Sequence, residues 1–148
     1  MKTAIVYYSK HHGNTKKLLD AIAAKHTVTL IDVTENPDAD LSGYDRIGLA
    51  SGIYFSSFAK QITAFAGEYL PEGADVFFIA TCGAAPTDNF FGAVEKAAAG
   101  KGYRVIGKYI CTGYDTFGPF KLVGGLRKGH PDASEIEGAV KFYEGLGE

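Results

Sequence analysis

A short polar segment follows the first apolar run of the chain. Residues 9–15 read Ser-Lys-His-His-Gly-Asn-Thr and lead into a run with helical spacing. Ser9 and Thr15 offer hydroxyl groups, and Asn14 offers an amide. Gly13 allows the backbone to come close to a ligand. The N–H groups and the dipole at the start of a helix favour an anion. The segment is therefore predicted to hold a phosphate group.

The spacing within this segment excludes other phosphate-binding motifs. It lacks the lysine of the nucleotide-binding motif G-x-x-x-x-G-K-(S/T), and no G-x-G-x-x-G follows the first apolar run. Neither Cys82 nor Cys111 is followed six residues later by arginine, so a cysteine phosphatase loop is not indicated.

The alternative to phosphate binding is that residues 9–15 form an ordinary strand-to-helix turn in which Asn14 caps the helix.

Two adjacent histidines, His11 and His12, also lie in the segment. Histidine can bind a metal or transfer protons, but no third ligand or carboxylate partner stands near this pair in the sequence. Contact with a phosphate, or exposure to solvent, is the favoured role for both. No catalytic residue and no metal site is predicted.

The elements that must position these residues follow from the apolar pattern. Helical spacing predicts four helices: Thr15–Lys25, Phe58–Tyr69, Asn89–Lys101 and Asp132–Leu146. Segments rich in apolar, β-branched and aromatic residues predict five strands: Thr3–Tyr8, Thr27–Val33, Arg46–Ser51, Val76–Thr81 and Tyr103–Cys111. Strands that alternate with helices favour a parallel sheet covered on both faces. We therefore expect an α/β fold with a doubly wound, five-stranded parallel sheet, as a single domain over residues 1–148.

Ligands of such sheets bind beyond the carboxyl ends of the strands. Three segments occupy that position: Ser9–Thr15, Ser51–Phe58 and Thr81–Asn89. A fourth, Thr112–His130, is a long glycine-containing connection, which is expected either to lie near the ligand or to cover the edge of the sheet. Asp132, followed three residues later by glutamate, predicts a capping box at the start of the last helix.

Composition excludes several classes of partner. The 15 basic and 17 acidic residues give a formal charge of −2, which provides no electrostatic basis for binding nucleic acid or an anionic membrane surface. The apolar part of the N-terminal segment is too short for a signal peptide, and no run approaches the ~20 apolar residues of a membrane span. Cys82 and Cys111 indicate neither a disulfide framework nor a zinc site. A cytoplasmic protein without stable membrane insertion is expected.

Three segments resemble proteins of the flavodoxin family. SKHHGNT, residues 9–15, resembles the flavodoxin phosphate loop (S/T)-x-T-G-x-T with one residue more. CGAAPTDNFFGAV, residues 82–94, resembles the flavodoxin segment that starts with Cys-Gly and ends with Gly-Ala-Val. SGIYFSSFAK, residues 51–60, is similar to the second loop of flavodoxin-like quinone and porphyrinogen oxidoreductases. The resemblance implies a flavodoxin-like fold with strand order 2-1-3-4-5 and FMN as the cofactor.

Carried over residue by residue, the resemblance implies which positions surround FMN. Its phosphate would be surrounded by Ser9, Lys10, His11, His12, Gly13, Asn14 and Thr15. Its ring would be flanked on one side by Ser51, Gly52, Ile53 and Tyr54, and on the other by Thr81, Cys82 and Gly83.

The second loop departs from the flavodoxin pattern. Flavodoxins usually stack a tryptophan and a tyrosine on the ring, whereas Ile53 and Thr87 stand at the matching positions. At least one of Tyr54, Phe55 and Phe58 is therefore expected to contact the flavin. Tyr54 and Phe55 also match the positions at which flavodoxins use a glycine that changes its backbone conformation. A positive φ at either residue would be strained.

Three functions remain open at this point. The first, and the leading hypothesis, is an FMN-binding protein that transfers electrons to a redox partner protein. The second is an FMN-dependent oxidoreductase that acts on a quinone or another small-molecule electron acceptor. The third is a flavodoxin-like module that binds a partner without flavin. A carrier would expose the flavin edge within an acidic patch, whereas an enzyme would have an apolar cleft beside the ring.

Overall fold

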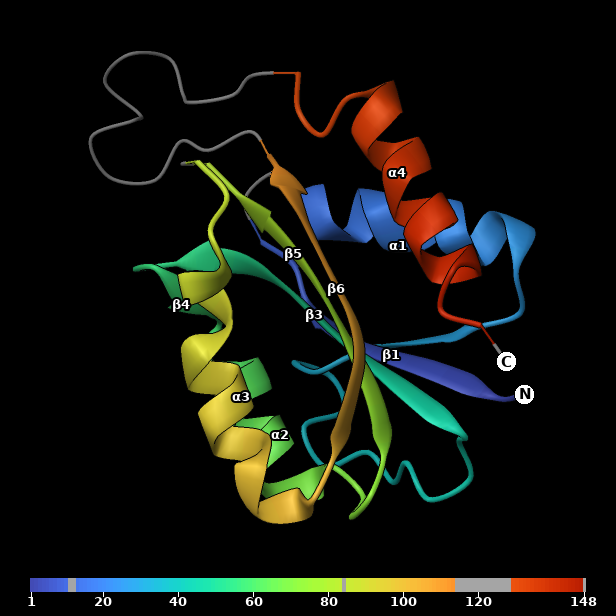
Figure 1. Cartoon of the computed structure of the whole chain (residues 1–148), viewed down its shortest axis with the longest axis vertical. Coiled ribbons are helices and arrows are strands. Elements are labelled where there is room, and N and C mark those ends of the chain that lie inside the picture. The colour runs from blue at the N-terminus through green and yellow to red at the C-terminus, as the bar shows by residue number, and fades with distance from the viewer. Residues whose placement is uncertain (11–12, 84, 114–128, 148) are drawn as a thin grey trace.

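Figure 1 shows the fold as a computed structural model, which describes residues 1–10, 13–83, 85–113 and 129–147. Its strands are β1 (Thr3–Tyr8), β2 (Thr29–Asp32), β3 (Arg46–Tyr54), β4 (Ser57–Phe58), β5 (Asp75–Cys82) and β6 (Arg104–Thr112). Its α-helices are α1 (Asn14–Lys25), α2 (Lys60–Tyr69), α3 (Gly92–Ala98) and α4 (Ala133–Glu144). Short 3₁₀ helices, η1 (Asp88–Phe91) and η2 (Ala99–Lys101), flank α3.

Parallel pairing joins five strands in the order β2-β1-β3-β5-β6. Counted along the predicted strands, this is the order 2-1-3-4-5, so the expected flavodoxin-like α/β fold is confirmed. The chain winds outward from β1 in one direction through β2 and in the other through β3. The switch point of the strand order therefore lies at β1 and β3, where ligands of such sheets bind.

One face of the sheet is covered by α1 and α4 (Figure 1). Leu18 of α1 and Val140 of α4 pack in one buried cluster with Ile5 and Phe77 of the sheet. Gly48 of β3 makes room for this cluster, because a Cβ atom there would lie 2.5 Å from the Phe77 ring. The apolar residues of the first and last predicted helices therefore face the sheet.

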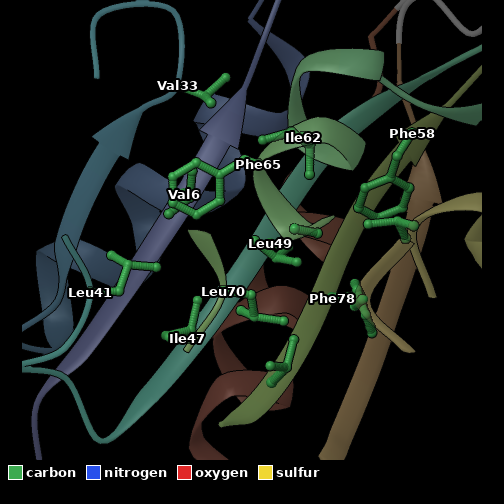
Figure 2. Packing of buried hydrophobic residues seen from close by; sticks show 14 of the residues in the cluster. Val6, Val33, Leu41, Ile47, Leu49, Phe58, Ile62, Phe65, Leu70 and Phe78 are labelled. Atoms are coloured by element: carbon green, nitrogen blue, oxygen red, sulfur yellow. The ribbon is translucent and has the colours of Figure 1, made fainter. Parts of the chain in front are cut away.

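The opposite face is covered by α2 and α3. Figure 2 shows Ile62 and Phe65 of α2 packed with Val6, Leu49 and Phe78 of the sheet. These strands are apolar on both faces, since helices cover both, which agrees with the near-continuous apolar runs in the sequence.

The second predicted loop is a β-hairpin. The structure extends β3 to Tyr54, beyond its predicted end at Ser51, and pairs it with the short antiparallel strand β4. Phe58, predicted to start a helix, instead pairs with Ile53 in the hairpin, and α2 starts at Lys60. A strand of two residues is too short for a period-2 pattern, so the sequence did not predict β4.

The last two predicted helices differ in how closely they match. Asn89–Lys101 is divided into η1, α3 and η2. The capping box at α4 is confirmed: the Asp132 side chain accepts from the N–H of Glu135, and the Glu135 side chain accepts from the N–H of Asp132.

Residues 114–128 of the connection before α4 lie outside the described residues. Within the described ranges, no helix combines the length and apolar character needed to cross a bilayer.

Candidate functional site

The carboxyl ends of β1, β3 and β5 lie side by side. Tyr8 at the end of β1 pairs in register with Ser51 of β3, and Ser51 pairs with Ala80 of β5. Gly52 pairs with Thr81 at the next position. The three predicted binding segments therefore leave the sheet at one edge.

The loop after β1 leads directly into α1. Gly13 is the N-cap residue, with a left-handed backbone (φ 64°) that glycine adopts without strain. Asn14, the cap in the alternative interpretation, is instead the first residue of the helix. Gly13, as the N-cap residue, offers no side-chain cap of its own, and the first turn of α1 has no acidic residue. This helix start therefore keeps the electrostatic character that suits an anion.

Two polar contacts tighten this loop. The N–H of Lys16 donates to Ser9 Oγ at 3.2 Å, and the N–H of Lys10 donates to the Tyr54 hydroxyl at 3.4 Å. The second contact joins the first segment to the hairpin. His11 and His12 lie outside the described residues, so their contact with phosphate stays a prediction.

The first turn of α1 is fixed against the ends of β5 and β6. The hydroxyl oxygens of Thr15 and Thr81 lie 2.9 Å apart, and both residues are buried. Gly113, directly after β6, allows the Asn14 side chain to approach, because a Cβ atom at Gly113 would lie 2.6 Å from Asn14 Nδ2. The first and third predicted segments are thus joined through side chains.

The turn of the hairpin has an unusual backbone. Phe55 and Ser56 both have positive φ, 50° and 64°, as in the two-residue turns that match the twist of a β-hairpin. The sequence indicated that Phe55 would be strained in this conformation, and the structure adopts it nevertheless. The Tyr54 ring folds back over Gly52, where a Cβ atom would lie 2.9 Å from the Tyr54 hydroxyl.

Replacing Ser56 with glycine should stabilise the fold by about 0.5–1 kcal/mol. A left-handed backbone costs a non-glycine residue about 1–2 kcal/mol, and the larger entropy of glycine in the unfolded chain offsets part of the gain. Urea denaturation of wild type and Ser56→Gly measures the difference. Ser57→Gly is the matched control, because Ser57 lies in β4 and glycine weakens a strand. Destabilisation by both changes would contradict the strain at Ser56.

Two of the residues predicted to flank the ring have side chains engaged in the fold. Ser51 Oγ accepts a hydrogen bond from the N–H of Ala59 at 2.9 Å, which holds the start of α2 against β3. Ile53 is half-buried and packs against the core that α2 and α3 cover. The Tyr8 and Tyr54 rings meet edge to face, with centroids 5.8 Å apart. Tyr54 therefore presents an aromatic side chain near the end of β1.

The third segment is buried at its start. Thr81, Cys82 and Gly83 all lie within the interior. The Cys82 thiol donates to the Cys111 carbonyl oxygen at 3.6 Å, and burial raises the pKa of Cys111 to about 12. A thiol with so high a pKa is a poor nucleophile at neutral pH. Further along, the Thr87 hydroxyl accepts from the N–H of Asn89 at the start of η1.

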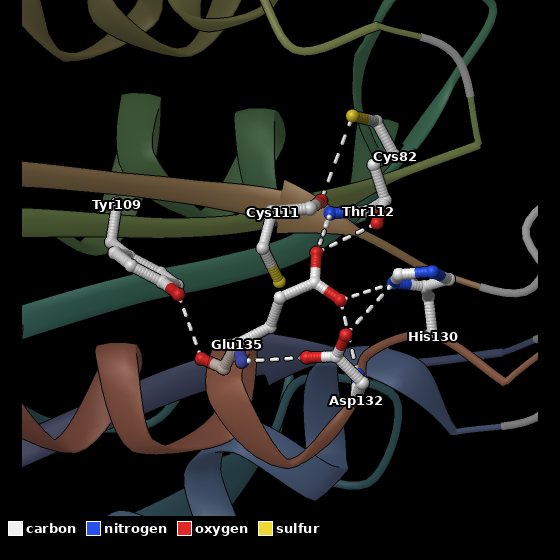
Figure 3. Close-up of polar contacts among 7 residues, drawn as sticks. All are labelled: Cys82, Tyr109, Cys111, Thr112, His130, Asp132 and Glu135. Atoms are coloured by element: carbon white, nitrogen blue, oxygen red, sulfur yellow. Dashed lines mark hydrogen bonds and ion pairs between the residues drawn. The ribbon is translucent and has the colours of Figure 1, made fainter.

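A polar network centred on Glu135 joins β6 to α4 (Figure 3). Glu135 Oε2 accepts from the N–H and the hydroxyl of Thr112, at 2.9 and 2.7 Å. Oε1 accepts from the N–H of Asp132 at 3.0 Å and from His130 Nδ1. The hydroxyl of Tyr109 donates to the Glu135 carbonyl oxygen at 2.7 Å. The capping-box spacing predicted only the contacts with Asp132.

The electrostatics of this network favour an ionised Glu135. Burial would raise its pKa, but hydrogen bonds from the Thr112 hydroxyl, from His130 and from the N–H groups of Asp132 and Thr112 lower it to about 2. Burial, followed by neighbouring groups that include Cys111, raises the pKa of Tyr109 to about 12. His130, Asp132 and Glu135 have the residue types of a metal site. However, both Glu135 oxygens already accept hydrogen bonds, so the arrangement is that of a structural anchor.

A groove of about 970 Å³ lies beside the β3–β4 hairpin. Its walls come from Tyr8 and Lys10, from the hairpin, from the first residues of α2 and from Ala93 of α3. The aromatic residues of the hairpin were predicted from the sequence, but the contribution of α2 was not. Helical spacing alone gives no sign that the start of α2 borders a cavity.

Comparisons with known proteins agree with this geometry. Residues 5–99 match the flavodoxin domain family. The chain is 33% identical over 147 residues to an uncharacterized protein of Methanocaldococcus jannaschii, and the match covers 99% of this chain and 98% of that protein.

Solved structures share the fold. Oxidised flavodoxin 2 from Bacillus cereus superposes with a TM-score of 0.66 at 18% identity and covers 97% of both chains. A flavoprotein from Lactobacillus acidophilus in complex with FMN superposes with a TM-score of 0.57 at 20% identity, over 74% of this chain and 92% of that chain. Together with the strand order and the family match, these likenesses show that the chain belongs to the flavodoxin domain family.

Proposed function

We propose that the protein binds FMN at the carboxyl ends of β1, β3 and β5 and uses it to transfer electrons. The observation that carries this proposal is the start of α1. It combines a left-handed Gly13 at the N-cap with a first turn that has no acidic residue, directly at the switch point of the sheet. An FMN phosphate fits such a helix start. The FMN bound by the Lactobacillus acidophilus flavoprotein of the same fold supports the choice of cofactor.

The residues around this point also suit the rest of the cofactor. Ser9 and Thr15 place hydroxyl groups at the loop and at the first turn of α1. Gly52 lies near the end of β3, where the Tyr54 ring packs beside it, and Gly83 directly follows β5. Tyr54 supplies an aromatic side chain from the hairpin. When bound, FMN supplies a ring that can take up and release electrons.

The protein's own residues orient the cofactor and limit side reactions. The contact between the Thr15 and Thr81 hydroxyls fixes the first turn of α1 relative to β5, and so fixes where a phosphate would sit relative to a ring between β3 and β5. The buried thiols of Cys82 and Cys111 provide no accessible redox partner. Electron transfer therefore requires that an external electron donor or acceptor approach the flavin ring.

The groove beside the hairpin supports a second candidate function, in which the flavin passes electrons to a small molecule. Its walls include Tyr8, Tyr54, Phe55 and Phe58, and none of its lining residues within the described ranges is acidic. A carrier that docks on basic protein partners would be expected to present acidic residues here. An FMN-dependent oxidoreductase acting on a small molecule is thus a specific form of the proposed function.

The proposal is tested by titrating the apoprotein with FMN and following flavin fluorescence and absorption. We expect saturation at one FMN per chain. The loaded protein is then reduced with dithionite without oxygen, and its reoxidation by a quinone and by cytochrome c is followed by stopped flow. Faster reoxidation than that of free FMN by either acceptor supports electron transfer. Failure to bind FMN would instead indicate a flavodoxin-fold module that acts without flavin.

A further inference from the structure

The groove beside the hairpin has aromatic walls that are open to solvent. Phe55, at the tip of the hairpin, is 85% exposed, the largest value among the large apolar residues that the structure describes. Tyr8 and Tyr54 line the groove next to it, in edge-to-face contact. At about 970 Å³, the groove has the size of a small-molecule site. Aromatic walls of this kind bind flat rings by stacking.

The rim of the groove is positively charged. Lys10 and Lys60 both line it, both are exposed, and no carboxylate lies among the described lining residues. The amino end of α2 also borders it through Ala59, Lys60 and Gln61. The N-cap residue, Ala59, has no side-chain acceptor, and the first turn of this helix holds no acidic residue. Two cationic side chains and the positive end of a helix dipole therefore attract an anionic compound into the groove.

We propose that this groove binds a planar aromatic compound that carries a negatively charged group, with the ring against Tyr8, Tyr54 and Phe55 and the anionic group near Lys60. The site is distinct from the phosphate loop, because most of its walls come from the hairpin and α2. The cavity and the aromatic side chains select the ring. The charge on the rim selects anionic compounds over neutral ones of the same shape.

The role of the bound compound as an electron acceptor rests on the proposed function, whereas its binding does not. Conversion of a quinone into its hydroquinone consumes two electrons and two protons. FMN that has been fully reduced releases the same two electrons and two protons when it is oxidised, so the exchange balances without another reactant. A compound in the groove would lie beside Tyr54, which also contacts the first loop through the N–H of Lys10.

The test uses the full chain without flavin and an anthraquinone monosulfonate as the probe, with its neutral hydroxymethyl analogue for comparison. Binding is measured by calorimetry. We expect one sulfonate per chain. Lys60→Gln should weaken sulfonate binding by about three- to tenfold and leave the neutral analogue nearly unchanged. Phe55→Ala should weaken both compounds. Lys96→Gln is the matched control, because Lys96 is exposed but does not line the groove.

Each other outcome overturns the proposal. Equal affinity for the two compounds, or no effect of Lys60→Gln, would show that the rim does not select an anion. Complete displacement of the sulfonate by FMN would identify the groove as part of the flavin site. Conversion of a dimer into a monomer by Phe55→Ala would identify it as an interface between two copies.

FMN titration of the same samples separates this proposal from the proposed function. If FMN binds and the sulfonate does not, the groove proposal fails while the flavin site stands. If the sulfonate binds and FMN does not, the proposed function fails while the groove proposal stands.

Discussion

FMN should bind the apoprotein at least about 100-fold more tightly than riboflavin, which has the same ring but no phosphate. A hydrogen bond to a charged group contributes about 1.5–3 kcal/mol, and a 100-fold change in affinity corresponds to about 2.8 kcal/mol. One or two such bonds from the loop after β1 therefore suffice. Calorimetric titration with both flavins at one salt concentration measures the ratio. Equal affinities would remove Ser9–Thr15 from the binding site.

Thr15 variants locate this preference within the loop. Thr15→Ala should weaken FMN by about 1–3 kcal/mol if the hydroxyl meets a phosphate oxygen, with little effect on riboflavin. Thr15→Ser keeps a hydroxyl and serves as the matched control. Because Thr15→Ala also leaves the Thr81 hydroxyl without its neighbour at 2.9 Å, the unfolding free energy of each variant must be measured as well. An equal loss for both flavins would indicate a structural role for Thr15.

Strand positions were predictable because they depend on local patterns. The bounds of β1 match the prediction at both ends, and the other parallel strands differ by a few residues at most. The strand order was predicted from the resemblance to flavodoxins, and the structure confirms it. The strand positions follow from the apolar runs that a sheet covered by helices on both faces requires, whereas apolar runs alone do not give the strand order.

The hairpin and the Glu135 network were less predictable, because each depends on contacts distant in sequence or on rare backbone conformations. The turn at Phe55 and Ser56 has no Asn-Gly or Asp-Gly signal, yet both residues adopt positive φ. Thr112 lies 23 residues before Glu135, and no spacing rule links them. By contrast, the cap between Asp132 and Glu135 is local, and its spacing predicted it correctly.

The free energy of unfolding should fall steeply as the pH drops below about 4.5, and Glu135 should account for part of the fall. Its pKa is lowered from 4.5 to about 2 because, although burial opposes ionisation, hydrogen bonds from Thr112, His130 and the N–H of Asp132 favour the carboxylate. Since the folded-state pKa lies below the unfolded one, this stabilisation is complete above pH 4.5 and is lost as the pH approaches 2. Tyr109 and Cys111, whose pKa values burial raises to about 12, stay neutral throughout.

Replacing Glu135 with glutamine should cost about 1–3 kcal/mol at pH 7, because a neutral amide cannot accept all the hydrogen bonds that the carboxylate accepts. Glu137→Gln is the matched control on the same helix. The Glu137 side chain is 63% exposed and pairs with Lys141 at 3.3 Å, and such surface pairs contribute about 0–1 kcal/mol. Urea denaturation at pH 7, 4 and 3 should show wild type and Glu137→Gln losing stability in parallel. Glu135→Gln should have a lower free energy of unfolding at pH 7 and lose less of it as the pH falls. This smaller loss distinguishes protonation of Glu135 from protonation of the neighbouring Asp132. A loss of stability in Glu135→Gln as steep as that of wild type would show that protonation of Glu135 does not cause the loss at low pH. The contact between β6 and α4 would then not depend on the charge of Glu135.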